Sequence, residues 1–540
     1  MPRLSANAAL GLCALLSMFF LSALGSVKAM DVEFEPDVEF IGADAVLIQG
    51  NVMLPRPEQQ NNSIHQQKFP AIIFINSWGL EEHEYIVQAY KLAQQGYIVL
   101  SYSARGWGKS GGTVNVAGPK DMADFSAAID WLIANTPVDE KRIGSAGISY
   151  GAGMALLGGA FDKRIKAVAS LSGWGDLADS LYGQETVDLV WGTLLVGVGY
   201  LNGRMDPYIL EVYQNLLAQR NMEEVLAWTA LRSPMHYIDK LNERKLPVYF
   251  SNNFRDELFE PNSIIKLFEQ LQGPKRLDLN LGNHTTAELG GLVGLQNYVW
   301  TNLTAWFDVH LKGKEDTRGV TSSKVSMAVK FESGRDEFEN WPHSRSANEI
   351  FYLSPKSFFS DGKLSTQPNR KRNADAIYNG ILSGASAGVP VLSSILESHI
   401  NVPVYANVNI GLNPALAVVY ESTPFREKKK IRGIPNVSLW LKPSAKNTQV
   451  VAYLYDVGSF GNARLITHGP ISLRDATPNR TYRLDFELIA TSYNVPKGNS
   501  IALVLDTQDE QYSPASIAPY RIELAFDRHQ QSTLSLPFSR

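Results

Sequence analysis

The stretch KRIGSAGISYGAGMALLGGA, residues 141–160, holds a serine between two glycines at its centre, in the pentapeptide Gly147-Ile148-Ser149-Tyr150-Gly151. A run of small residues typical of a β-strand precedes Ser149, and an apolar run typical of a helix follows it. A G-x-S-x-G pattern at a strand-to-helix turn exposes the serine hydroxyl at the top of an α/β sheet. The same pattern also arises by chance in glycine-rich bends, so the rest of the chain has to decide between a nucleophile and a bend.

Strand-like and helix-like segments alternate on both sides of this stretch, from about residue 31 to residue 312. The predicted strands are 46–54, 71–75, 97–101, 142–148, 165–171, 247–251 and 277–281, and the clearest predicted helices are 90–95, 119–135 and 151–160. Several of the strands are continuously apolar, as strands buried on both faces are. Repeated β-α units of this kind predict an α/β fold with a mostly parallel sheet covered on both faces.

Residues 178–240 interrupt the alternation, because they contain helix-like sequence and no predicted strand. An insertion of this size between sheet strands is expected to lie over the strand ends as a helical cap. A helical layer far from any functional site is the alternative.

Beyond about residue 320 the helical patterns fade and strand-like runs replace them, among them VSMAVKF at 325–331 and NVSLWLK at 436–442. Glycine, proline, asparagine and aspartate separate these runs, as in all-β domains. We therefore predict a catalytic α/β domain over residues 30–318 and a β-sandwich of the jelly-roll type over residues 319–540.

The composition narrows the function classes. The 540 residues include 50 lysines and arginines and 54 aspartates and glutamates, a net charge of −4, so no basic excess is present to bind a phosphate backbone. We expect no nucleic-acid partner, and we see no spacing of metal ligands and no sign of a cofactor site.

The first 29 residues have the pattern of a cleavable signal peptide. Arg3 precedes an apolar core over residues 8–24, and Val27-Lys28-Ala29 fits a small-x-small cleavage site. This pattern predicts a secreted or periplasmic protein with no stable membrane insertion after cleavage; an uncleaved anchor is the alternative. Cys13, the only cysteine, lies inside the predicted signal, so the mature chain would have neither a disulfide nor a thiolate metal site.

A serine nucleophile needs a base and a group that orients the base. In α/β sheets with a nucleophile elbow these partners follow in the chain order serine, acid, histidine. Of His236, His284 and His310, we choose His284, because it follows a late strand and such sheets carry their functional groups beyond the carboxyl ends of strands. The acid should come from the loop after strand 247–251, where both Asp256 and Glu257 could orient an imidazole.

The tetrahedral intermediate of acyl transfer also needs hydrogen-bond donors for its oxyanion. The backbone N–H of Tyr150, directly after the nucleophile, is one predicted donor. The second should come from the loop Asn76-Ser77-Trp78-Gly79, through the backbone N–H of Trp78 or through its indole N–H. A purely structural Trp78 that packs against the cap is equally compatible with the sequence.

These motifs together resemble the X-Pro dipeptidyl-peptidase and cocaine-esterase family of serine hydrolases, along most of residues 40–525. The segments that carry the resemblance are Arg105-Gly-Trp-Gly-Lys-Ser-Gly-Gly112, GISYG, Arg232-Ser-Pro234, Asn253-Phe-Arg-Asp256 and, in the second domain, Leu454-Tyr-Asp-Val457. The family fold is an α/β-hydrolase domain with a helical cap, followed by a jelly roll. The resemblance favours Asp256 over Glu257 as the acid, which would leave Glu257 a solvated loop carboxylate.

Two departures from the family pattern stand out. Family members often carry a tyrosine at the position of Trp78, and the loop Leu281-Gly282-Asn283 before His284 is unlike the expected sequence. The first leaves the second oxyanion donor open, and the second leaves the leaving-group side of the site unassigned.

The expected function is an exported serine hydrolase that cleaves carboxylic esters or amides through an acyl-enzyme on Ser149, with a small-molecule or short-peptide substrate. An X-Pro dipeptidyl-peptidase is the first alternative, and a non-catalytic binding protein on a decayed hydrolase is the second. Recognition of a free α-amino group would need carboxylates in the pocket. Asp188, Glu211, Glu223 and Glu224 of the cap are candidates for it, whereas the apolar run 190–198 favours an apolar acyl or aryl pocket.

Overall fold

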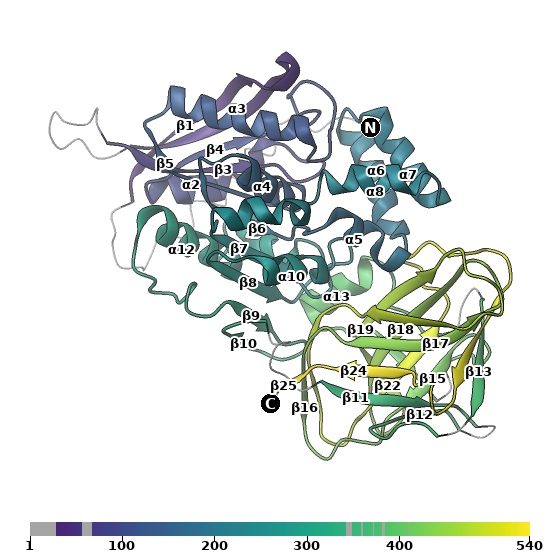
Figure 1. Ribbon diagram of the computed structural model, residues 1–540. Helices are drawn as coiled ribbons and strands as arrows, with labels where there is room; N and C mark the ends of the chain where they lie inside the picture. The colour runs from purple at the N-terminus through teal and green to yellow at the C-terminus, as the bar shows by residue number, and fades with distance from the viewer. Residues whose placement is uncertain are drawn as a thin grey trace, which may run out of the picture.

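The computed structural model describes residues 29–56, 67–341, 348–357, 360–370, 372–380, 384–409 and 411–539. The predicted signal peptide, except for its last residue, lies outside the described residues. Figure 1 shows two parts, an α/β part in purple to teal and a strand-rich part in green to yellow.

The α/β part is built on a sheet of ten strands in the order β1-β2-β4-β3-β5-β6-β7-β8-β9-β10. From β4 to β9 every neighbouring pair is parallel, and β1, β2 and β10 are added antiparallel at the edges. The strands are β1 (Asp31–Ile41), β2 (Leu47–Arg56), β3 (Phe69–Ile75), β4 (Ile98–Tyr102), β5 (Val138–Ile148), β6 (Ile165–Leu171), β7 (Val248–Asn253), β8 (Lys275–Asn280), β9 (Val325–Ala328) and β10 (Arg335–Phe338).

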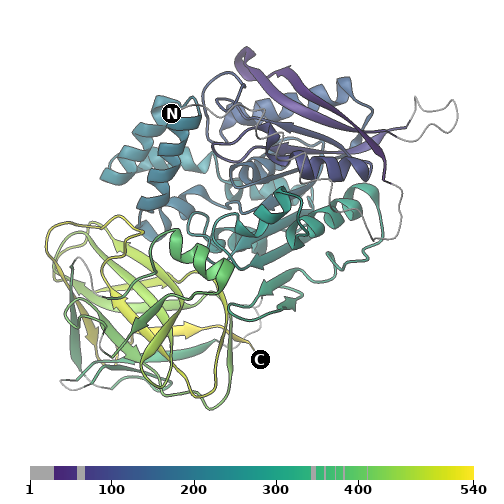
Figure 2. The same cartoon turned by 180° about the vertical axis from the view of Figure 1, so that it is seen from behind.

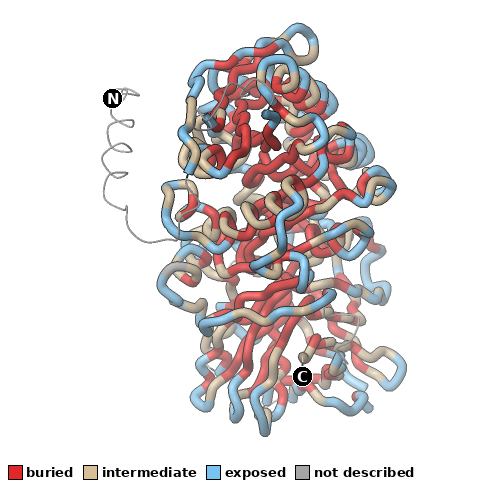
Figure 3. The backbone as a smooth tube through the Cα atoms, turned by 90° about the vertical axis from the view of Figure 1, so that its left-hand side faces the viewer, coloured by how far each residue is buried: buried red, intermediate tan, exposed pale blue. Residues whose placement is uncertain are grey.

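Helices cover both faces of this sheet, so alternate residues of one strand enter different cores. In β3, Ile73 packs in the core with α3 (Pro119–Asn135), α4 (Tyr150–Phe161) and α10 (Pro261–Gln270). Phe74 packs in the opposite core with α2 (Ile86–Gln94) and α12 (Tyr298–Lys312). This two-sided burial explains the continuously apolar strands. In Figure 3 the buried backbone runs through the middle of the molecule.

Between β6 and β7 the chain forms helices and no named strand. They are α5 (Leu177–Leu181), α6 (Leu189–Asn202), α7 (Pro207–Ala218), α8 (Met222–Ala230) and α9 (Ile238–Glu243). In Figure 1, α6, α7 and α8 form a group of their own, apart from the helices that flank the sheet. This group is the cap.

The strand-rich part contains a twelve-stranded sheet, a three-stranded sheet and a separate apolar core. Its elements are β11 (Glu349–Ser354), β12 (Gly362–Ser365), β13 (Asn373–Tyr378), α13 (Leu392–Ile400), β14 (Tyr405–Asn407), β15 (Val418–Glu421), β16 (Lys429–Gly433), β17 (Asn436–Pro443), β18 (Thr448–Val457), β19 (Asn462–Leu473), β20 (Tyr482–Glu487), β21 (Thr491–Val495), β22 (Ser500–Asp506), β23 (Arg521–Phe526), β24 (Thr533–Leu536) and β25 (Phe538–Ser539). In Figure 2, α13 lies at the junction of the two parts. The architecture is the predicted α/β hydrolase followed by a β-rich domain.

One strand lies in the other part from the one we expected. We predicted 325–331 as a strand of the second domain, but Val325–Ala328 is β9 and pairs in parallel with β8. The first sheet therefore continues through β10 to Phe338, twenty residues beyond the predicted domain division.

Candidate active site

Ser149 sits on a strained turn between β5 and α4. Its backbone has φ +56° and ψ −115°, a combination that non-glycine residues rarely adopt. The flanking glycines permit the turn, because a Cβ on Gly147 would approach the backbone of Gly151 to 2.4 Å, and one on Gly151 would approach the Ile75 carbonyl oxygen to 2.1 Å. The pentapeptide is thus a nucleophile elbow in geometry and not a loose bend.

The three side chains predicted as a triad lie in one hydrogen-bonded chain. His284 Nε2 is 2.7 Å from Ser149 Oγ, and His284 Nδ1 is 2.9 Å from Asp256 Oδ2. Asp256 is fully buried, and its other oxygen accepts hydrogen bonds from the backbone N–H groups of Leu258 and Phe259 at 3.0 and 2.8 Å. These bonds fix the carboxylate, so it can orient the imidazole against the serine.

The two histidines not chosen as the base and the carboxylate not chosen as the acid all have other partners. His236 is half exposed and pairs with Asp176. His310 packs at a tilt against Trp306 in α12, where burial lowers the pKa of His310 to about 4. Our interpretation of Glu257 as a solvated carboxylate is wrong. Its side chain is buried and accepts a 2.8 Å hydrogen bond from the backbone N–H of Val391, next to α13.

The structure decides one of the two options for Trp78. Its indole N–H donates to the carbonyl oxygen of Leu195 in α6 at 2.9 Å, and its ring packs edge-on against Trp107 and Tyr150. The indole therefore anchors the cap and is not free for an oxyanion. The backbone N–H of Trp78 remains the candidate donor in this loop.

The loop that carries Trp78 is held from behind by Glu84. This carboxylate accepts bonds from both the backbone N–H and the hydroxyl of Ser77, at 2.7 and 2.6 Å. Burial raises the pKa of Glu84 to about 7. The opposite candidate donor, the N–H of Tyr150, begins α4 and so has no carbonyl of its own helix to bind.

A cavity of about 110 Å³ opens beside Ser149 and extends under the cap. Trp78 and Tyr150 line it near the serine, and most of the remaining wall comes from α5 to α8. The predicted cap therefore covers the candidate site and is not a distant helical layer.

The second domain contributes directly to the loop that carries Asp256. Arg255 donates to the carbonyl of Ala387 at 2.9 Å, and its guanidinium lies 3.5 Å from Glu257 and 3.7 Å from Glu397 of α13. Gln511 donates to both the Glu257 carbonyl and the Asp188 carboxylate, each at 3.2 Å, and so joins the acid loop to the start of α6. Sequence reasoning missed these contacts, since no local pattern marks a partner more than 100 residues away.

Two arginines in the segments that carry the family resemblance are structural. Arg105 forms a bidentate pair with the buried Asp124 at 2.7 Å. Arg232 donates to the carbonyls of Asn115 and Trp228, and its burial lowers its pKa to about 10. Arg105 thus holds its loop against α3, and Arg232 holds the end of α8 against the loop of Asn115.

A buried carboxyl lies four residues beyond His284. Glu288 accepts from the hydroxyl of Ser251 at 2.9 Å while its second oxygen has no partner, and burial raises its pKa to about 7. No sequence signal distinguishes this glutamate from an exposed helix charge.

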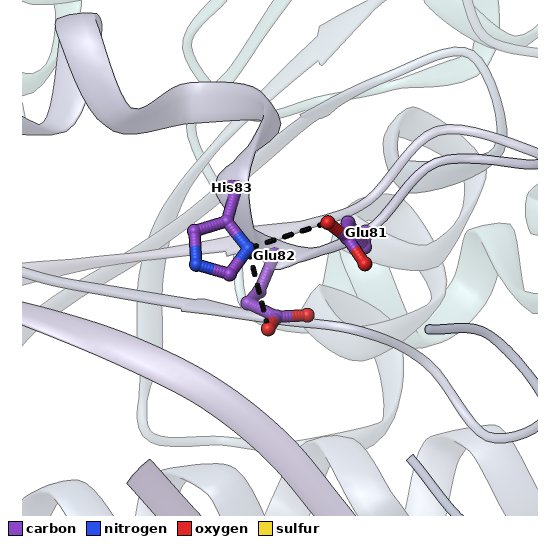
Figure 4. A group of neighbouring side chains, drawn as sticks. All are labelled: Glu81, Glu82 and His83. Carbon is purple, nitrogen blue, oxygen red and sulfur yellow. Dashed lines mark ion pairs between the residues drawn. The ribbon is translucent and has the colours of Figure 1, made fainter. Parts of the chain in front are cut away.

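Within the described residues, one group of side chains could hold a metal ion, namely Glu81, Glu82 and His83 (Figure 4). Glu81 and His83 are accessible to solvent, and the buried Glu82 accepts a hydrogen bond from Ser103. Nothing in this geometry requires a metal.

Among the described residues, no helix has the length and the hydropathy needed to span a membrane.

Two family models match the chain. Residues 44–286 match the X-Pro dipeptidyl-peptidase (S15 family), and residues 318–533 match the X-Pro dipeptidyl-peptidase C-terminal non-catalytic domain. The chain belongs to the X-Pro dipeptidyl-peptidase family. The family resemblance found in the sequence is thereby confirmed.

Individual relatives are more distant. An uncharacterised protein of Pseudomonas aeruginosa is 38% identical over 106 residues, which are 19% of this chain and 29% of that protein. A Xaa-Pro dipeptidyl-peptidase of Lacticaseibacillus rhamnosus is 22% identical over 545 residues, covering 85% of this chain and 64% of that one. The chain spans less than two thirds of the length of either relative.

Solved structures resemble the chain along nearly its whole length. An α-amino acid ester hydrolase superposes with a TM-score of 0.71 at 14% identity and covers 97% of this chain and 99% of its own. A CocE/NonD family hydrolase from Staphylococcus aureus gives a TM-score of 0.71 at 13% identity and covers 94% of each chain. At these identities the likeness establishes the fold.

Proposed function

We propose that this protein is an exported serine hydrolase that cleaves carboxylic esters or amides through an acyl-enzyme on Ser149. The observation that carries the proposal is the continuous contact from Asp256 through His284 to Ser149, with the serine on a strained elbow beside a cavity. Strain is kept at such a position when the surrounding structure holds it for function.

In the proposed reaction, Ser149 Oγ attacks the substrate carbonyl carbon while His284 Nε2 takes the hydroxyl proton. Asp256 keeps the imidazole in the tautomer with its free nitrogen toward the serine and stabilises the imidazolium. The tetrahedral intermediate collapses, the protonated imidazole gives its proton to the leaving group, and the acyl group stays on Ser149. Water activated by His284 then releases the carboxylic acid.

The backbone N–H groups of Tyr150 and Trp78 are the proposed oxyanion donors. One such donor is worth about 2.7–4 kcal/mol in the transition state. The short bonds from Ser77 to Glu84 support the second assignment, because they hold the Trp78 loop in one conformation.

Export rests on the pattern of residues 1–29 alone. It is tested by mass spectrometry of the N-terminus of protein recovered from the periplasm or medium. A mature chain that begins near Met30 is expected, and a chain that retains residues 1–29 in the membrane fraction would contradict export.

An X-Pro dipeptidyl-peptidase is the second candidate, favoured by the similarity to the Lacticaseibacillus rhamnosus enzyme over 85% of this chain. The test compares p-nitrophenyl esters with Gly-Pro-p-nitroanilide and adds fluorophosphonate labelling, for wild type and Ser149→Ala. We expect ester turnover and labelling that are lost in Ser149→Ala. Absence of both in the wild type refutes the hydrolase, and preferential cleavage of Gly-Pro-p-nitroanilide favours the peptidase.

A further inference from the structure

The cavity beside Ser149 has an apolar wall. Near the serine it is lined by Trp78, Tyr150 and Phe259, and under the cap by Val212, Leu216 and Val225. The last three belong to a small core of the cap itself, separate from the main core of the sheet. The cavity therefore reaches from the proposed nucleophile into the centre of the cap.

Most of the polar side-chain atoms in this wall already have partners. The hydroxyl of Tyr182 donates to Gln219 at 2.7 Å, that of Tyr213 lies 2.7 Å from Thr193 Oγ1, and that of Thr229 donates to the Leu226 carbonyl at 2.9 Å. The indole N–H of Trp174 donates to the Arg232 carbonyl at 2.8 Å. A group inside the cavity would therefore have few hydrogen-bond partners beyond the reacting centre.

No charged side chain is among the residues that line the cavity in the described structure. Of the four cap carboxylates proposed for amine recognition, Glu211, Glu223 and Glu224 are exposed on α7 and α8. Asp188 is buried, but its oxygens accept from the N–H of Trp191 at the start of α6 and from Gln511. An ammonium ion in the cavity would lose its hydration without gaining a counter-ion, which is strongly unfavourable.

The size of the cavity limits the group that it can hold. A dry apolar cavity of about 150 Å³ accommodates benzene. At about 110 Å³, this one is of the same order, so we match it to a group of about the size of benzene, either a single ring or a chain of about four to six carbons.

Its position indicates which half of the substrate enters. The leaving group must lie beside His284 to receive its proton, and His284 does not line the cavity, although Phe259 of its wall packs edge-on against the His284 ring. Ser149, which holds the acyl group through both steps of the proposed reaction, does line it. The cavity therefore lies on the acyl side of the scissile bond.

Resting on the proposed function, we infer that the substrate is an ester or amide of an uncharged, apolar carboxylic acid with one ring or about four to six carbons, whose acyl group enters this cavity. Val225 on α8, at the cap end, sets the accepted chain length. Substrates with a free α-amino group on the acyl part, which include X-Pro dipeptides, are excluded by the same wall.

The charge test uses wild type and two substrates of nearly equal shape. p-Nitrophenyl isobutyrate carries a methyl group at the position where L-alanine p-nitrophenyl ester carries its amino group, and at pH 6.5 that amine is charged. After division by the uncatalysed rate of each ester, we expect kcat/KM at least tenfold higher for the isobutyrate. Equal values, or a preference for the alanine ester, overturn the inference while the hydrolase stands.

The length test uses p-nitrophenyl esters from acetate to laurate. In wild type, kcat/KM should rise about fourfold for each added methylene up to about six carbons and then fall, as each methylene leaves water for the cavity. Val225→Ala should move the optimum to longer chains, and Val225→Phe should move it to shorter ones. Leu201→Ala and Leu201→Phe, at an 84% exposed position of α6, are the controls and should leave the optimum unchanged.

The outcomes separate the two levels of the proposal. No turnover of any ester and no fluorophosphonate labelling would refute the proposed hydrolase itself. Turnover with the same optimum in wild type and both folded Val225 variants would refute the assignment of the cavity alone.

Discussion

Replacing Ser149 with glycine should leave a more stable fold than replacing it with alanine, and either change should abolish activity. Ser149 has φ +56° and ψ −115°, which costs a residue with a Cβ about 1–3 kcal/mol, whereas glycine adopts these angles freely. Alanine at 149 removes the same hydroxyl and keeps the strain. The difference between Ser149→Gly and Ser149→Ala therefore isolates the backbone term.

The expected magnitude is the relief of strain minus the entropy of the added glycine. Glycine makes the unfolded chain more flexible, which costs about 0.4–1 kcal/mol. Ser149→Gly should thus be more stable than Ser149→Ala by up to about 2.6 kcal/mol, with a central value of about 1.3 kcal/mol. In a domain of this size each kcal/mol corresponds to about 2–4 °C in Tm, which differential scanning calorimetry resolves.

Ser145 is the matched control, because it is buried in the same strand, β5, and its hydroxyl donates to the Ala155 carbonyl. The strand interior has no strain to relieve, so Ser145→Gly should melt below Ser145→Ala. A Ser149→Gly protein that melts at or below Ser149→Ala would refute a strained elbow, even if both are inactive.

Three further predictions concern the site. Because burial raises the pKa of Glu288 from 4.5 to about 7, the folded state holds its proton longer than the unfolded state, and stability falls as pH rises through this interval. The stability of Glu288→Gln relative to wild type should therefore rise by about 2–3 kcal/mol between pH 5 and pH 8, as measured by calorimetry. A difference in stability that is the same at both pH values contradicts this. Trp78→Phe should keep kcat within about threefold, since the backbone N–H remains, whereas a loss of about 100-fold or more would assign the oxyanion to the indole. Asp256→Asn should lower kcat by about 10⁴-fold, while Glu257→Gln should lower Tm with kcat within about tenfold; the reverse result would exchange the two carboxylates.

Local patterns predicted the elements that local forces determine. The helix expected at 119–135 is α3 residue for residue, because Pro119 suits its first turn and one apolar face meets the sheet. The strand expected at 165–171 is β6, whose residues are buried except Lys166. Strand β1 was missed because most of its side chains are accessible to solvent, so it lacks the apolar run by which the central strands were found.

The triad was predictable for a related reason. In a parallel sheet the chain order and the position after each strand bring loops to one edge, so Ser149, Asp256 and His284 could be found without any contact being known. The orientation of Trp78 and the burial of Glu257 could not, since each depends on a segment distant in sequence. The Trp78 indole donates a hydrogen bond to a residue of α6 that is 117 positions away in the sequence, and Glu257 accepts one from Val391, 134 positions away.

Hydrogen bonds between residues far apart in the sequence also connect the second domain to the candidate site, which sequence patterns could not suggest. Gln511 bonds the acid loop through the Glu257 carbonyl and the cap through Asp188, and its own carbonyl accepts from the N–H of Leu189 at the start of α6. Gln511 therefore holds both the loop that carries Asp256 and helix α6, which lines the proposed acyl cavity.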